Sequence, residues 1–143
     1  MARQFAEQAV GAARGLGDDR LFIKALAELC SAHFFAGEPD LGLPFGQESV
    51  ERARPLGDDL LLAASLLLYL QAIGPAASGQ LFGEAIACTE RSGDHLTNPW
   101  LHNDAGWVAL AVGDIPAARA HLDAAAHAGQ QIGRYSRPLP QRV

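Results

Sequence analysis

NDAGWVALAVGD, residues 103–114, and the IPAAR that follows as residues 115–119 form the stretch that decides the fold. Gly113 suits a left-handed residue just past a helix end, because glycine has no Cβ to clash there. Asp114 can then accept a hydrogen bond from a free N–H of the next helix. Pro116 falls in the first turn of that helix, where a missing N–H costs nothing. The stretch therefore predicts two helices joined by a tight turn.

Each of the two predicted helices has one apolar face at three- to four-residue spacing. These faces consist of Leu101, Ala105, Val108 and Ala109 on the first helix and Ala118, Leu122, Ala125 and Ala126 on the second. Gly106 and Ala118 stand where the two helices would cross closely. A pair this rich in alanine cannot bury a core alone, so it needs further pairs stacked against it, as in a solenoid.

A glycine-marked break of the same kind recurs along the chain. Gly17, Gly57, Gly93 and Gly133 follow one another at intervals of 40, 36 and 40 residues, with second breaks near Gly37, residues 74–79 and Gly113. Most of these breaks combine a helix stop with a plausible cap. They predict an all-α fold of about seven antiparallel helices, over residues 2–16, 19–36, 39–55, 58–73, 80–92, 96–112 and 115–130.

This spacing predicts one domain over residues 1–133. It consists of a half repeat at 1–16 and full repeats at 17–56, 57–92 and 93–133. Residues 134–143 hold Pro138 and Pro140 and are expected to form an extended or disordered tail.

Two of the expected helices have unusual composition. The helix at 39–55 contains Gly42, Pro44 and Gly46, which predicts a kink or a late start near Pro44. Sequence drift in a tolerant repeat and a bend that opens a groove are both compatible with these residues. The helix at 58–73 is apolar nearly all round, which predicts the most buried layer of the fold.

The central stretch resembles the tetratricopeptide (TPR) repeat. The matching positions are Gly106, Gly113, Asp114, Ala118, Leu122 and Ala125, and the departures are His102 and Ala109, where the family usually has larger aromatic residues. The resemblance implies a TPR-like superhelix of about three and a half helix pairs, in which the first helix of each pair lines a concave face. On that face it implies a partner-binding surface formed by Lys24, Ser31, Phe34, Leu67, Gln71, Trp100, Asn103, Trp107 and Leu110.

The repeated LGD breaks and the AGWVALAVGDIPAAR core, residues 105–119, are also similar to the long-helix TPR arrays of large bacterial LuxR-type and related ATPase regulators. In those proteins such arrays sense ligands or partners. The similarity implies a chain that is part or relic of a bacterial transcriptional regulator.

Composition narrows the choice of partner and compartment. The net charge is −5 and there is no basic cluster, which argues against nucleic acid and anionic membranes. The apolar run at residues 60–73 is shorter than the roughly 20 residues of a membrane span and is interpreted as a buried helix. Cys30 and Cys88 form no disulfide or metal pattern, so we expect packed thiols in a reducing cytoplasm.

No catalytic or metal-binding motif is visible in the sequence. The five histidines form no pair at i, i+4 on one helix, and the glycine-rich segments follow no strand. The acids Asp18, Asp19, Asp58, Asp59 and Asp94 stand at helix starts and are interpreted as caps. We therefore expect no catalytic residue, cofactor or metal.

These observations predict a non-catalytic scaffold that binds a protein or peptide. Two alternatives stay open: a self-associating module that forms a homodimer through its terminal helices, and a small α-helical enzyme with an unrecognised site. Trp100 and Trp107 are the interesting aromatic residues, and either groove or core positions suit them.

Overall fold

The computed structural model describes residues 2–77 and 79–135, apart from the side chains of residues 132–135. This part of the chain is all-helical, which confirms the predicted all-α class. Its α-helices are α1 (Ala2–Leu16), α2 (Asp19–Phe35), α3 (Pro39–Ala53), α4 (Asp59–Ile73), α5 (Gly79–Ser92), α6 (Thr97–Ala111) and α7 (Ile115–Tyr135). Two short 3₁₀ helices, η1 (Arg54–Leu56) and η2 (Gly74–Ala76), follow α3 and α4.

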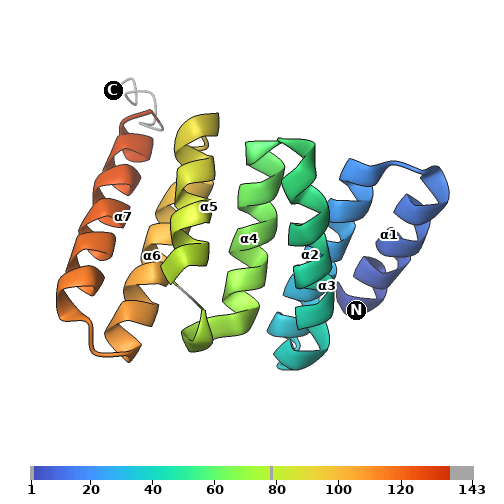
Figure 1. Cartoon of the computed structure of the whole chain (residues 1–143), viewed down its shortest axis with the longest axis horizontal. Coiled ribbons are helices and arrows are strands. Elements are labelled where there is room, and N and C mark those ends of the chain that lie inside the picture. The colour runs from blue at the N-terminus through green and yellow to red at the C-terminus, as the bar shows by residue number, and fades with distance from the viewer. Residues whose placement is uncertain (1, 78, 136–143) are drawn as a thin grey trace, which may run out of the picture.

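The helices stand side by side along the long axis of the molecule, with α1 at one end and α7 at the other (Figure 1). Each helix packs against the next one in sequence. In addition, α2 packs against α4, and α4 packs against α6. We call these three helices the α2–α4–α6 row, and one of its faces carries the candidate site described below.

Left-handed glycines end the turns between the helices, as the sequence predicts. Positive φ angles occur at Gly17, Gly37, Gly57, Gly74, Gly93 and Gly113. Four of the predicted caps are also present, whereas Asp19 and Asp59 are the first residues of α2 and α4 and do not cap them. Asp18, Asp58 and Asp114 each accept a hydrogen bond of 3.1 Å from the backbone N–H three residues later. Asp94 accepts bonds from the backbone N–H groups of Leu96 and Thr97.

The predicted break at Gly133 is wrong. Helix α7 runs through this glycine to Tyr135, so residues 134 and 135 belong to the helix and not to the expected tail. A glycine costs a helix only about 1 kcal/mol relative to alanine, and no aspartate cap follows this one. The remaining tail residues, 136–143, lie outside the described part of the chain.

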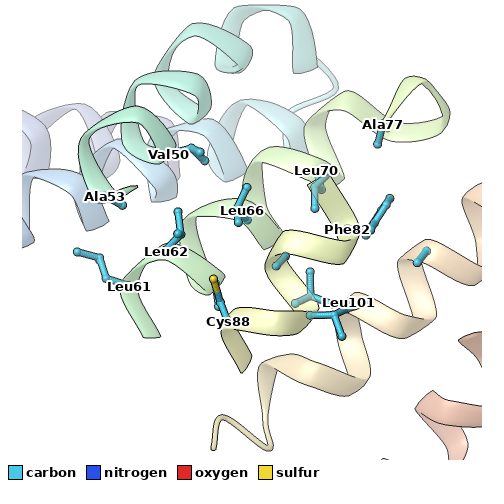
Figure 2. Close-up of a cluster of buried hydrophobic side chains, with 14 of the residues drawn as sticks. Val50, Ala53, Leu61, Leu62, Leu66, Leu70, Ala77, Phe82, Cys88 and Leu101 are labelled. Carbon is cyan, nitrogen blue, oxygen red and sulfur yellow. The ribbon is translucent and has the colours of Figure 1, made fainter. Parts of the chain in front are cut away.

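Helix α4 forms the centre of the main apolar core. Side chains from successive helices meet around it, and Figure 2 shows among them Val50 of α3, Leu66 of α4, Phe82 of α5 and Leu101 of α6. Leu66 and Leu101 are completely buried. A smaller second core joins α1 to α2, through Val10, Ala13, Phe22, Ala25, Leu26 and Leu29.

The window Asp59–Ala76 is apolar and long enough to cross a membrane by composition alone. In the fold this window is α4 with η2, and α4 packs against α2, α3, α5 and α6. A helix that is apolar all round and enclosed by neighbours is typical of the core helix of a soluble protein.

For the third helix we expect a kink or a late start near Pro44; the late start is wrong, because α3 begins at Pro39 and holds Pro44 inside it, and the kink stays a prediction. Its glycines have a packing role instead. A Cβ on Gly42 would lie 2.7 Å from the carbonyl oxygen of Cys30, and a Cβ on Gly46 would lie 2.7 Å from the Cys30 sulfur. The glycines therefore let α3 approach α2 closely. Gly106 plays the predicted part between α6 and α7, where a Cβ would lie 2.7 Å from Cγ of Leu122.

This close approach predicts opposite effects of alanine at two helical glycines. Gly42→Ala should lower the free energy of unfolding by about 1–3 kcal/mol, because the new methyl meets backbone that cannot move aside. Gly83→Ala in α5 is the matched control, because a Cβ there has nothing within 4 Å. It should raise the free energy of unfolding by about 0.5–1 kcal/mol through helix propensity.

Urea unfolding followed by circular dichroism measures both variants against the wild type. Equal stability of the two variants would contradict the packing role of Gly42.

Candidate recognition site

An open pocket lies where the α2–α4–α6 row meets the start of α5. Its volume is about 390 Å³. We call it the aromatic pocket, and it is lined by Phe34, Phe35, Leu70, Gln71, Gly74, Pro75, Phe82, Asp104, Trp107 and Val108. The C-terminal end of α2, the end of α4 with η2, and the middle of α6 all contribute to it. Its volume falls in the range of small-ligand and side-chain binding sites.

The floor and the rim of the aromatic pocket differ in exposure. Leu70 and Phe82 are buried at 1% and 4% exposure and form part of the main core. Phe35 and Trp107 are 78% and 59% exposed. Phe34 and Phe35 contact each other edge to face, with ring centroids 5.2 Å apart. Large aromatic side chains left open to water around an apolar floor are a common sign of a binding surface.

One acid stands within this apolar lining. Asp104 accepts a hydrogen bond of 3.3 Å from Nε2 of Gln71, across the contact between α4 and α6. Burial raises the pKa of Asp104, while hydrogen bonds from Gln71 and Asn103 oppose the rise. Within residues 2–77 and 79–135, the ion pairs of the structure do not include this carboxylate.

The structure brings together three residues of the predicted partner-binding surface. Phe34, Gln71 and Trp107 all line the aromatic pocket. Lys24 and Leu110 are exposed but lie outside its lining, and Leu67 is half-buried against the main core. The exposure of Trp107 decides that it is not a core residue.

One predicted residue does not reach the surface. Ser31 is only 9% exposed, so it cannot present a side chain to a partner as expected. The reason is that α2 packs against both α3 and α4, which leaves little of its surface open.

Trp100 and Asn103 belong to a different hollow, between α6 and α7. Pro99, Leu122, Ala125 and Ala126 line it with them. Trp100 is 62% exposed, so it too lies outside the core. The predicted surface is thus divided between two places on the molecule, and its aromatic residues do not form one continuous strip.

The predicted partner-binding surface left out much of the pocket, including Phe35, Phe82 and Asp104. Phe82 lies in a second helix of a pair, and the resemblance to TPR repeats directs attention to first helices only. Asp104 had a usable signal, because it is an isolated acid between Trp100 and Trp107 on a largely apolar helix. The longer loop at residues 74–79 was a second usable signal, since Gly74 and Pro75 line the pocket.

A pair of histidines also comes together, between α6 and α7. The Nδ1 atoms of His102 and His121 lie 3.1 Å apart. Burial lowers the pKa of His102, the charge of His121 lowers it further, and Glu90 opposes both effects. In the described part of the chain, no cluster of three or more His, Cys, Asp or Glu side chains is placed to hold a metal ion.

The two cysteines pack as expected. Cys30 and Cys88 are free thiols with no exposed surface. Burial raises the pKa of Cys30 to about 11, and burial also raises the pKa of Cys88. Both groups are therefore protonated and unreactive at neutral pH.

No protein-family model matches the chain, and no curated protein sequence matches it significantly. The functional interpretation rests on the geometry and chemistry of the residues themselves.

The histidine pair predicts a loss of stability in mild acid. A histidine whose pKa is lowered by folding binds its proton more readily in the unfolded state. Stability from this pair is fully present above the ordinary histidine pKa of about 6.5 and declines as the pH falls below it. His102→Phe removes this contribution and keeps an aromatic ring at the position.

Denaturant unfolding at about pH 7.5 and about pH 5.5 measures the effect. The wild type should lose more free energy of unfolding over this interval than His102→Phe. A variant that loses as much as the wild type would show that His102 does not titrate as described.

Proposed function

We propose that the chain is a TPR-like helical-repeat scaffold that recognises a segment of another protein without catalysing a reaction. The aromatic pocket is the centre of this recognition. The observation that carries the proposal is the exposed aromatic rim, Phe34, Phe35 and Trp107, around a floor that belongs to the rigid core. Such anchors contribute most of the binding energy at protein interfaces.

Two features support the repeat interpretation. The left-handed glycines recur at similar intervals along the chain, and each is followed by a helix that packs on its neighbour. The first helices of successive pairs, α2, α4 and α6, contact one another. This arrangement is the one expected when helix pairs stack so that each pair buries the apolar face of the next.

A recognition role agrees better with the pocket than an enzymatic one. Among the described lining residues, Asp104 is the one titratable side chain. General acid–base chemistry usually needs convergent groups whose pKa values are set against each other, and a nucleophile needs an adjacent base. An open apolar surface with a single acid is suited to binding a side chain.

The cellular setting follows from the sequence resemblance. On that basis we propose a cytoplasmic protein related to bacterial LuxR-type regulators, in which the array senses a partner. Two buried free thiols agree with a reducing compartment.

Selection from a random peptide display library tests the proposal. Full-length protein should enrich peptides that no longer bind Trp107→Ala, because this substitution removes the largest exposed anchor of the rim. Since Trp107 is mostly exposed, its loss should change the free energy of unfolding by less than about 1 kcal/mol. Trp100→Ala is the matched control, because it removes an indole of similar exposure outside the pocket.

Binding that survives Trp107→Ala, or the absence of any enriched peptide, would contradict the proposed site. Light scattering of the same samples reports the alternative homodimer. Phe5 and Leu16 of α1 are 64% and 72% exposed, and a stable dimer that buries them would favour the self-associating module.

A further inference from the structure

The aromatic pocket holds an unbalanced charge. Its walls are apolar and aromatic, yet the Asp104 carboxylate is half-buried among them. Removing a carboxylate from water is costly unless a cation or several hydrogen bonds replace the lost hydration. Hydrogen bonds from the Gln71 amide, at 3.3 Å, and from Asn103 replace part of that hydration, and none of the ion pairs in the described part of the chain reaches Asp104.

We infer, on the basis of the recognition function proposed above, that the aromatic pocket accepts an arginine side chain of the bound segment, with Asp104 as its counter-charge. A guanidinium group can interact with the aromatic rings of the pocket and with its carboxylate at the same time. Its planar faces stack on aromatic rings such as Trp107 and Phe35, and its N–H groups donate to a carboxylate. The apolar stem of arginine can cover the buried floor formed by Leu70 and Phe82.

Gln71 favours a guanidinium over an ammonium group. Its Nε2 atom donates to Asp104, which leaves its amide oxygen as an acceptor beside the carboxylate. A guanidinium presents several donors in one plane and can reach both acceptors, whereas an ammonium is a compact and strongly hydrated charge. The net charge of −5 also favours the approach of a basic segment.

A titration with small probes tests this inference in the full-length protein. The probe is ethylguanidinium, and N-ethylurea is its neutral counterpart of similar shape. The two indole N–H signals in the NMR spectrum report the location, because Trp107 lines the pocket and Trp100 lies in the other hollow. Ethylguanidinium should shift the Trp107 signal and leave Trp100 unchanged. It should bind about tenfold more tightly than N-ethylurea, the order expected of a charge-assisted bond with cation–π stacking.

Two variants test whether the preference for ethylguanidinium over N-ethylurea depends on the Asp104 carboxylate. Asp104→Asn should reduce the affinity for ethylguanidinium to that for N-ethylurea. Asp123→Asn removes an exposed acid of α7 outside the pocket and should leave the preference unchanged. If Asp104→Asn proves unstable, the wild type itself suffices: lowering the pH until the Asp104 signal titrates should weaken ethylguanidinium binding.

The results that overturn the inference are distinct from those that overturn the proposed function. The arginine site is refuted if ethylguanidinium and N-ethylurea bind equally, or if the preference for ethylguanidinium survives Asp104→Asn. It is also refuted if ethylammonium, used as a third probe, binds more tightly than ethylguanidinium. If display still selects Trp107-dependent peptides, recognition stands and only the arginine assignment fails. If display selects none while the charge preference is present, the pocket binds a guanidinium but peptide recognition fails.

Discussion

The rest of the structure depends on the need to enclose one helix. Helix α4 is apolar around most of its circumference, and Leu61, Leu62, Ala63, Leu66, Leu70 and Ala72 are buried. Such a helix must have neighbours on several sides, because each fully buried leucine is worth about 1.5–3 kcal/mol relative to exposure. The neighbours are α2, α3, α5 and α6. Together they place the α2 residues and the α6 residues of the aromatic pocket on either side of α4.

Small residues and turns set the distances between neighbouring helices. The surface ion pairs add little to the stability of the fold. Arg54 forms a two-bond pair with Glu84, Arg91 does the same with Asp59, and Arg20 pairs with Asp58. Arg54–Glu84 and Arg20–Asp58 link successive helix pairs, whereas Arg91–Asp59 joins α4 to α5 within one pair. All three are exposed to solvent, where ion pairs contribute little to stability. Gly42 and Gly46 instead control how closely α3 approaches α2, and Gly106 controls how closely α7 approaches α6.

Most helix boundaries could be predicted because their turns and caps are formed by neighbouring residues. Contacts between residues distant in the sequence could not be predicted. In the Gly–Asp pairs at residues 17–18, 57–58 and 113–114, the glycine has the expected positive φ angle. The aspartate accepts the expected capping hydrogen bond from a backbone N–H three residues later. The role of Gly42 depends on a carbonyl twelve residues earlier, and the hydrogen bond of Asp104 on an amide 33 residues earlier. No periodicity encodes such contacts. The exposure of Trp107 was undecidable for a related reason, since α6 is weakly amphipathic and its open face is defined only by the helices that pack against it, α4, α5 and α7.

Native-state hydrogen exchange tests the central position of α4 most directly. If this helix is enclosed as described, its backbone amides exchange most slowly in the molecule, with free energies that match global unfolding. Amides of α1, whose main packing partner is α2, exchange faster through local opening. Exchange in α4 that is as fast as in α1 would contradict the account, because the core and the pocket beside it would then lack the support described.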